Sequence, residues 1–291
     1  MRFVFRLALV SLFAALAGCA RTEHMSAGDS GSAPESSMLT LKGSDTMVIL
    51  GQRWAEAYMK ANAGATVQVT GGGSGTGIAA LINGTTDICE SSRPMKDKER
   101  DDVQAKRGAP AVETKVALDA LAIYVSASNP LTEIAIPALR GVYLGDTKSW
   151  KAIGGPDHAI VLYGRENNSG TYGYFKEHVL ENKDFAAAVQ TLAGTSAVVA
   201  AVKGDPFGIG YGGIAYLEGI RALKVKKDDG SPAVAPTLQT AQDGSYPIAR
   251  FLYFYTAGEA VGLGKRFIEW VKSPAGQSVI EQVGYYPLPK G

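Results

Sequence analysis

The chain has 291 residues, with 29 lysine and arginine residues against 28 aspartate and glutamate residues and a formal net charge of +1. This length accommodates one large domain or two ordinary ones, and a hydrophobic fraction of 46% is typical of a globular protein rather than a disordered one. The charge balance lacks the basic surplus that nucleic-acid binding requires, so we expect no nucleic-acid partner.

The first residues have the pattern of an export signal. Arg2 and Arg6 precede an apolar run over 7–17, which is too short for a membrane-spanning helix of about 20 residues. The run ends in Leu-Ala-Gly before Cys19. Small residues before a cysteine resemble the lipobox of bacterial lipoproteins, and the alternative is an ordinary secretory signal with a chance cysteine. We predict a lipoprotein signal peptide over 1–18 and a lipidated Cys19, which anchors the chain to a membrane in the periplasm or on the outer cell surface.

Residues 19–38 comprise this cysteine and a segment of Ser, Gly, Ala, Pro and charged residues without an apolar face, which predicts a flexible tether. Cys89 then has no intrachain partner, so we expect no disulfide. The histidines, His24, His158 and His178, lack metal-ligand spacing. We therefore predict no metal, no cofactor and no catalytic residue.

From residue 39 the sequence alternates between strand and helix patterns, which indicates an α/β fold. In the first half, strands are predicted over 39–41, 66–70 and 87–90, and helices over 47–62 and 78–82. In the second half, strands are predicted over 160–163 and 208–211, and helices over 172–180, 259–272 and 275–282.

Two further extended stretches, 121–126 and 249–255, stand apart from this alternation. If both are crossovers, the chain builds one lobe, leaves to build a second, and returns. We therefore predict two lobes with the ligand in the cleft between them. Lobe 1 comprises 39–120 plus 250–291, and lobe 2 comprises 121–249.

Four loops that follow predicted strands combine Ser or Thr with Gly or Arg. They are Gly43–Thr46, Gly71–Gly77, Ser91–Arg93 and Arg165–Thr171. A helix N-terminus carries unpaired N–H groups and partial positive charge, and glycine lets an anion approach that backbone closely. One such loop is ordinary, because Ser and Thr are common helix caps. Four of them favour an oxyanion site, in which Arg165 supplies a bidentate clamp for a tetrahedral anion.

With these motifs the chain resembles the Pst-type phosphate-binding proteins, the periplasmic substrate-binding components of phosphate ABC transporters, over about residues 39–291. The motifs are GSDT at 43–46, GGGSGTGI at 71–78, SSRP at 91–94, RENNSGTY at 165–172, YPIARFLYFYT at 246–256 and GQSVIEQVGYYPLP at 276–289. The resemblance implies a type II-like periplasmic-binding-protein fold that captures inorganic phosphate and delivers it to membrane permease and ATPase subunits. It implies no enzyme, and we expect a monomer.

The resemblance also implies a set of phosphate-binding residues. They are Ser44, Asp45, Thr46, Ser74, Ser92, Arg93, Arg165, Ser169, Gly170 and Thr171. In a longer branch of the family, an aspartate stands where this chain has Ser92 and accepts a hydrogen bond from protonated phosphate. Near pH 7 phosphate keeps at least one proton and sulfate none, so such an acceptor rejects sulfate. Asp45 is the best remaining acceptor here, and the alternative is that Asp45 only caps a helix.

Other functions fit fewer residues. A binding protein for another tetrahedral oxyanion, or a surface phosphate sensor or adhesin without transport, remains open on the sequence. A phosphate-ester hydrolase would need a nucleophile with a base or metal, which the motifs do not supply. The glycines of 208–213 match a dinucleotide-binding pattern, but the segment that follows is too short for the phosphate-binding helix. We therefore expect these glycines where a strand meets a turn.

Overall fold

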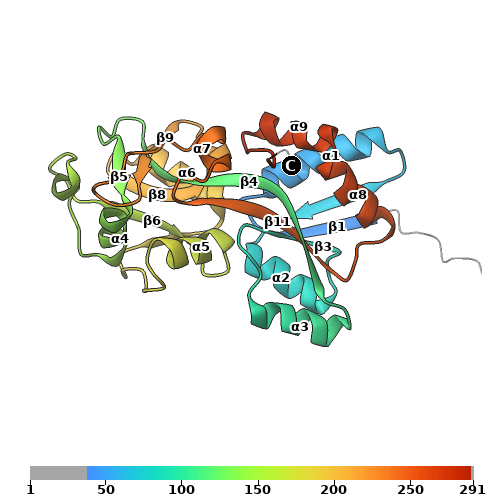
Figure 1. The fold of residues 1–291 in the computed structure, drawn as a ribbon. Helices are drawn as coiled ribbons and strands as arrows, with labels where there is room; N and C mark the ends of the chain where they lie inside the picture. Colours follow the sequence, from blue (N-terminus) through green and yellow to red (C-terminus); the bar gives the residue numbers. More distant parts are fainter. Residues whose placement is uncertain (1–37, 290–291) are drawn as a thin grey trace, which may run out of the picture. The chain divides into compact units, whose positions relative to one another are not determined.

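Residues 38–289 are described by a computed structural model of the chain. The predicted signal peptide (1–18), Cys19 and the predicted tether as far as residue 37 lie outside the described residues. Strands and helices alternate in both halves of the described part, as the sequence predicted (Figure 1). Within residues 38–289, no helix combines the length and apolar character that crossing a membrane requires.

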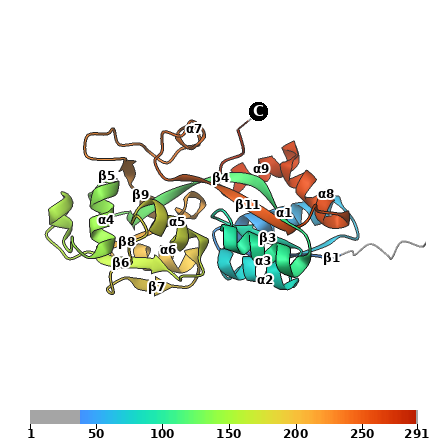
Figure 2. The ribbon, with the colours of Figure 1, turned by 60° about the horizontal axis from the view of Figure 1, so that its bottom comes forward.

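Most strands form one long sheet in the order β2-β1-β3-β11-β4-β8-β6-β7, with β9 (Ile220–Ala222) paired to β4 beside this order. The strands β5 (Glu133–Ala135) and β10 (Lys224–Lys226) form a separate parallel pair. At one end, β1 (Met38–Gly43) pairs in parallel with both β2 (Thr66–Thr70) and β3 (Ile88–Ser91). At the other end, β6 (Val161–Arg165) pairs in parallel with β7 (Gln190–Leu192) and β8 (Gly208–Gly213). Between these ends run two long strands, β4 (Ala111–Ser126) and β11 (Ala249–Ala257), which are antiparallel and side by side (Figure 2).

These two strands are the crossovers between the lobes. Residues 111–120 of β4 pair with β11, and residues 121–125 pair with β8. The predicted two-lobed α/β fold with two crossovers is therefore confirmed. We propose the boundaries 39–120 plus 250–291 for lobe 1 and 121–249 for lobe 2, because the pairing of β4 changes partner between Ala120 and Leu121.

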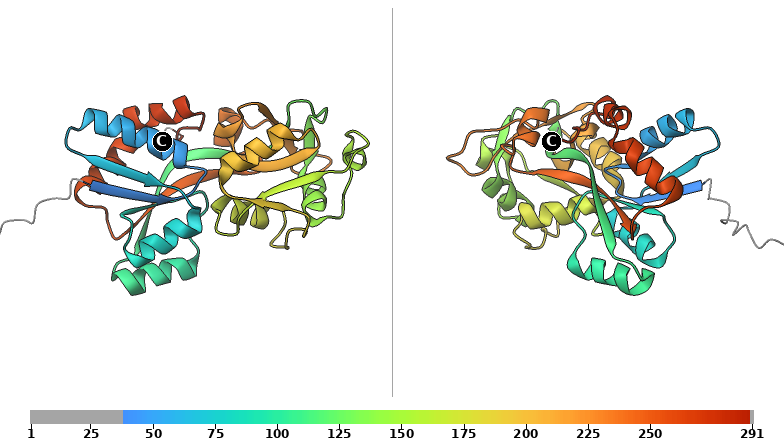
Figure 3. Two further views of the ribbon diagram at one scale, coloured as in Figure 1. Left: turned by 180° about the vertical axis from the view of Figure 1, so that it is seen from behind. Right: turned by 45° about the vertical axis from the view of Figure 1, so that its right-hand side comes forward.

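Helices cover the sheet in both lobes. In lobe 1, α1, α8 and α9 lie on one face and α2 and α3 on the other (Figures 1 and 3). The bounds are α1 (Val48–Ala61), α2 (Ser74–Asn83), α3 (Asp97–Arg107), α4 (Ile136–Leu144), α5 (Gly170–His178), α6 (Gly194–Gly204), α7 (Leu238–Gln242), α8 (Gly262–Lys272) and α9 (Pro274–Val283). Short elements complete the fold: β5 (Glu133–Ala135), β9 (Ile220–Ala222), β10 (Lys224–Lys226), and 3-10 turns at Trp150–Ile153 and Ile214–Tyr216.

The lobe 1 core is built around an aromatic cluster that ties its helices to a crossover strand. Trp54 of α1 is fully buried, and its ring packs edge-on against Phe254 of β11 with centroids 5.5 Å apart. The indole N–H donates to the carbonyl of Gly276 in α9 at 2.8 Å. A buried indole needs such a partner, because an unpaired donor costs free energy. This packing fixes α1, whose N-terminus lies at the candidate site, to the rest of lobe 1.

Several boundaries differ from the predicted ones. The prediction that α2 starts at residue 78 was wrong, because the helix begins at Ser74 inside the glycine-rich loop. The prediction of residue 172 for α5 was wrong for the same reason, since the helix begins at Gly170. The residues that the prediction left out at the start of these helices are Ser, Thr and Gly, which carry no apolar pattern. A prediction from apolar spacing therefore places the start of each helix too late. The glycines of 208–213 lie in β8 before a single 3-10 turn, as expected.

Candidate functional site

Loops from both lobes meet in a buried cluster of hydroxyl groups. The Oγ1 atoms of Thr46 in lobe 1 and Thr171 in lobe 2 are 2.7 Å apart. The Oγ of Ser74 accepts from the backbone N–H of Ser92 at 3.1 Å, and the two Oγ atoms are 3.4 Å apart. All four side chains are at most 1% exposed. The structure thus brings together hydroxyls from all four loops that the sequence singled out, three in lobe 1 and one in lobe 2.

Three helices begin at this cluster. Thr46 and Met47 lead into α1, Ser74 opens α2, and Thr171 lies in the first turn of α5. The first turns of these helices, all within the described residues, contain no acidic side chain. Helix N-termini present N–H groups and partial positive charge, so the combined potential of the three favours an anion.

Glycine at position 170 allows the lobes to touch. A Cβ on Gly170 would lie 2.2 Å from the Oγ of Ser74 and 2.7 Å from the Oγ of Ser92, closer than any packed carbon can approach. Nearby, the backbone N–H of Gly75 donates to the carbonyl of Asn168 across the lobes at 2.8 Å. Ser169 caps α5, because its Oγ accepts from the N–H of Tyr172 at 3.3 Å. The RENNSGTY segment is therefore shaped by close backbone approach as well as by hydroxyl chemistry.

Arg165 ends β6 and points its guanidinium between the lobes. Its Nη1 donates to Thr195 Oγ1 at 2.9 Å, and its Nη2 donates to Asp45 Oδ2 at 2.6 Å. The residue is 2% exposed, and its Nε has no hydrogen-bond partner within residues 38–289. Burial lowers the pKa of Arg165, while the nearby Asp45 carboxylate opposes that shift. The guanidinium stays charged, since its ordinary pKa lies far above neutrality.

Asp45 is an ion-pair residue rather than a helix cap. Besides Arg165, its carboxylate accepts from the backbone N–H of Gly72 at 2.7 Å through Oδ1. The N-cap of α1 is Met47, with no side-chain capping bond. Asp45 therefore binds together the GSDT loop, the glycine-rich loop and lobe 2. The neighbouring Ser44 is 1% exposed, and its backbone N–H donates to the carbonyl of Glu90 at 2.9 Å.

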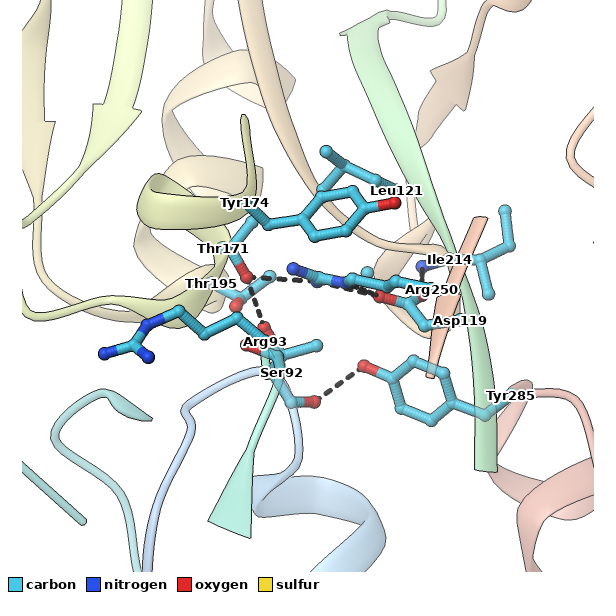
Figure 4. Close-up of polar contacts among 12 residues, drawn as sticks. Ser92, Arg93, Asp119, Leu121, Thr171, Tyr174, Thr195, Ile214, Arg250 and Tyr285 are labelled. Carbon is cyan, nitrogen blue, oxygen red and sulfur yellow. Dashed lines mark hydrogen bonds and ion pairs between the residues drawn. The ribbon is translucent and has the colours of Figure 1, made fainter. Parts of the chain in front are cut away.

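Arg93 lies beside the cluster, but its charge is directed elsewhere. Its two terminal nitrogens donate to both carboxylate oxygens of Glu99 at 2.8 and 2.7 Å. The Cδ of Arg93 would be 3.3 Å from a Cβ on Gly173 in α5. The stem of Arg93 thus packs against lobe 2, and its guanidinium forms an ion pair with Glu99 of α3. Figure 4 shows the guanidinium of Arg93 extending away from Thr171 and Arg250.

Sequence reasoning missed a second arginine in this region. Arg250 of β11 is 4% exposed and donates from Nη2 to Thr171 Oγ1 at 3.1 Å. It pairs with the fully buried Asp119 of β4, as Figure 4 shows. The available signal was Arg250 in the predicted stretch 249–255, and Asp119 just before the other predicted stretch, as the one charged residue of the apolar run 116–126. Long buried charges without a partner are rare, so each predicted an opposite charge nearby.

A buried carboxyl group of β3 lies against α1. Glu90 is 0% exposed, and neither of its carboxylate oxygens has a hydrogen-bond partner within residues 38–289. Its Oε1 would be 2.4 Å from a Cβ on Gly51 in α1. Burial raises the pKa of Glu90 well above its ordinary value, because it disfavours the charged carboxylate.

No group of three or more potential metal ligands occurs in the described part of the chain. His158 and His178 are both exposed and stack on Phe207 and Tyr174, respectively. The donors gathered at the site are hydroxyls, backbone N–H groups and the Arg165 guanidinium, which suit an oxyanion, and the Asp45 carboxylate lies beside them.

The chain is similar to known proteins that bind an oxyanion. A family described as "PBP superfamily domain" matches residues 28–275. The phosphate-binding protein PstS of Pseudomonas aeruginosa is 35% identical over 269 residues, covering 86% of this chain and 83% of the relative. The phosphate-binding protein PstS of Bacillus subtilis is 32% identical and covers 97% of this chain and 92% of the relative.

Solved structures share the fold. A phosphate ABC transporter substrate-binding protein from Clostridium perfringens, with bound phosphate, superposes with a TM-score of 0.78 at 24% identity, covering 86% of this chain and 99% of that one. An ABC-type phosphate transport receptor from Vibrio cholerae superposes with a TM-score of 0.69 at 26% identity, covering 85% and 99%.

Proposed function

The chain belongs to the PstS family of phosphate-binding proteins within the PBP superfamily, and from this premise we propose that it binds inorganic phosphate outside the cytoplasmic membrane and delivers it to an ABC-type phosphate permease. The observation that carries the proposal is the meeting of three helix N-termini, buried hydroxyls and Arg165 between two lobes. The family consists of binding proteins, which agrees with the expectation that the chain is not an enzyme.

Binding replaces contacts that the lobes make with each other. In the structure, Thr46 donates to or accepts from Thr171, and Arg165 is paired with Asp45. A phosphate between the lobes offers four oxygens to the same hydroxyls and to the guanidinium. The proposed ligand-binding set is Ser44, Asp45, Thr46, Ser74, Ser92, Arg93, Arg165, Ser169, Gly170 and Thr171. No covalent step is involved, because the work is to exchange the hydration shell of the anion for fixed donors.

The proposed roles within this set differ. Arg165 and the first turns of α2 and α5 supply charge and donors. Ser169 and Ser44 shape the loops through the bonds already described, and Arg93 contributes through its stem unless the Glu99 pair breaks. Asp45 is the proposed acceptor for the phosphate proton. The Asp45 side chain is 18% exposed, and its carboxylate is paired with Arg165. It therefore lies beside the guanidinium that is proposed to bind the anion. A carboxylate there opposes a fully deprotonated sulfate.

A calorimetric titration of the mature chain tests the function. We expect tight binding of one phosphate, comparable binding of arsenate, which has the same shape and protonation, and much weaker binding of sulfate. Equal binding of phosphate and sulfate would favour a general oxyanion carrier. Absence of binding to all three anions would contradict the proposal.

The membrane attachment is a separate proposal. We propose that Cys19 carries the lipid anchor, that a signal peptide over 1–18 is removed, and that the mature chain is a monomer. The sequence Leu-Ala-Gly-Cys at 16–19 and the short apolar run before it support the signal peptide and the lipid anchor. Expression of the Cys19→Ser variant in a bacterium should release the protein from the membrane fraction. A variant that stays equally membrane-bound would rule out the anchor.

A further inference from the structure

The two crossover strands carry a buried ion pair next to the proposed phosphate site. Arg250 of β11 and Asp119 of β4 are direct cross-strand neighbours. The Nε of Arg250 donates to Asp119 Oδ2 at 2.9 Å, and its Nη2 lies 2.8 Å from the same oxygen. The other oxygen, Oδ1, accepts from the backbone N–H of Ile214 in lobe 2 at 2.9 Å. Asp119 therefore fixes Arg250 to both crossovers and to the turn after β8.

Arg250 extends from this pair to the first turn of α5. Its Nη2 donates to Thr171 Oγ1 at 3.1 Å. The ring of Tyr174 covers the guanidinium, with 5.3 Å between the ring centroid and Cζ, and the Tyr174 hydroxyl donates to the carbonyl of Ala249 at 2.8 Å. Figure 4 shows Arg250 between Asp119 and Thr171 with Tyr174 above it. The arginine is thus held on several sides and can move little relative to Thr171.

This arrangement limits how the Thr171 hydroxyl is used, because the contact with Arg250 takes one of its two acceptor lone pairs. A guanidinium only donates, so Thr171 Oγ1 is the acceptor in its bond with Arg250. The proton of the Thr171 hydroxyl is then left for a third group. In the structure that neighbour is Thr46 Oγ1 at 2.7 Å. An anion placed between the lobes presents an oxygen to the same proton.

We propose that Arg250 is a positioning residue for phosphate: held by Asp119, it occupies the acceptor side of Thr171 and commits that hydroxyl to donate to the anion. The inference rests on the proposed function. A further observation supports it. The Nη1 of Arg250 is buried without a hydrogen-bond partner among residues 38–289, and such unpaired donors are rare in native structures and call for an explanation. Arg250 thus differs from Arg165, which is proposed to contact the anion itself.

The test is a double-mutant cycle on the mature chain, with phosphate binding measured by calorimetry. The variants are Arg250→Lys, which keeps the charge but cannot hold both partners, Thr171→Val, which keeps the shape but lacks the hydroxyl, and the double variant. The matched control is Arg140→Lys. Arg140 is a lobe 2 arginine that donates to the carbonyl of Val179 and pairs with Glu181. Melting temperatures without phosphate report separately on folding.

We expect each single variant to weaken phosphate binding at least tenfold, and the double variant to bind within about threefold of Thr171→Val, because Arg250 acts through that hydroxyl. The control should bind within twofold of wild type. Arg250→Lys binding within threefold of wild type would overturn the inference. So would a double variant whose loss is the product of the two single losses, since that indicates independent effects.

The experiment also covers a variant that does not fold and a wild-type chain that does not bind phosphate. If Arg250→Lys fails to fold, Asp119→Asn takes its place in the cycle, because it removes the charge that holds Arg250 while keeping an acceptor for Ile214, and the same criteria apply. If wild type binds no phosphate, the proposed function fails and this inference fails with it. If wild type binds phosphate and the cycle is additive, only this inference fails.

Discussion

The protein contains two buried arginine–aspartate pairs near the same site, and they are built differently. Arg165 and Asp45 come from different lobes, and the Asp45 side chain is 18% exposed. Arg250 and Asp119 come from neighbouring strands of one sheet, and their side chains are 1% and 0% exposed. The first pair must break if the lobes separate. The second joins two paired strands, so separation of the lobes does not require it to break.

The comparison separates two uses of the same chemistry. An ion pair between moving parts can exchange its carboxylate for a ligand, because both partners regain solvent or a substitute when the parts separate. An ion pair inside a sheet cannot, since breaking it leaves buried charges uncompensated. Arg165 is therefore the arginine expected to bind phosphate directly, while Arg250 orients a neighbouring hydroxyl.

The largest effect is expected from removing Arg165, the arginine of the pair between the lobes. Arg165→Ala should weaken phosphate binding by about 2–5 kcal/mol, roughly 30-fold to several thousand-fold, because a buried anion loses its charged partner. Arg165→Lys should restore only part of this loss, since an ammonium cannot form the paired fork. Calorimetric titration measures both. The control is Arg53→Ala, an exposed lobe 1 arginine with the same change in charge. Near-wild-type binding by Arg165→Ala would identify the wrong arginine.

A smaller loss of phosphate affinity is expected from a substitution that separates the lobes without changing the charge. Gly170→Ala places a carbon 2.2 Å from Ser74 Oγ, so the two lobes must separate locally. We expect at least a tenfold loss of phosphate affinity with little change in melting temperature. Gly204→Ala is the matched control, because a Cβ there meets nothing within 4 Å. Equal phosphate binding by the two variants would show that close contact of the lobes is not needed.

Replacing Asp45, the aspartate of the pair between the lobes, should change the selectivity for phosphate over sulfate more than the phosphate affinity. Asp45→Asn keeps an acceptor for the Gly72 N–H but leaves Arg165 without its counter-charge. An amide can also donate to sulfate. We expect phosphate affinity to change less than tenfold, while the preference for phosphate over sulfate falls at least tenfold in competition titrations near pH 7. If both proteins reject sulfate equally, Asp45 only organises Arg165 and the loops.

The smallest expected effect is on the pH dependence of stability, and it comes from Glu90, a buried carboxyl group that is not paired with an arginine. The folded state raises the pKa of Glu90 through burial, so above about pH 4.5 the unfolded chain releases a proton that the folded chain keeps. Stability therefore falls as pH rises through this window, by at most about 1.4 kcal/mol per pH unit. Melting temperatures between pH 5 and pH 8 should fall less for Glu90→Gln than for wild type. The exposed Glu56→Gln variant should follow wild type. Identical pH profiles for all three proteins would mean that Glu90 ionises in the folded chain.

The fold and most of the candidate site could be predicted from local sequence patterns. The two crossovers were recognisable as apolar stretches, although β4 starts at Ala111 rather than 121 because its first residues alternate with charges on a partly exposed edge. The four loops with Ser or Thr beside Gly or Arg were recognisable because each follows a predicted strand and each offers hydrogen-bond donors to an anion.

The remaining features depend on contacts between distant segments. Asp119 and Arg250 are 131 residues apart, and only the register of β4 against β11 places them opposite each other. The ion-pair partner of Arg93 could not be predicted from the sequence either. Its partner Glu99 lies on α3, a strongly charged helix in which only Val103 is buried, so apolar spacing does not reveal it. The pairing of Asp45 with Arg165 likewise depends on how the two lobes meet.

A crystal structure of the mature chain with phosphate tests the central claim most directly. The account predicts one anion between the lobes, within hydrogen-bond distance of Thr46 and Ser74 from lobe 1 and of Arg165 and Thr171 from lobe 2, with Arg250 still bonded to Asp119. An anion bound to one lobe alone, or at a place remote from Arg165, would contradict it.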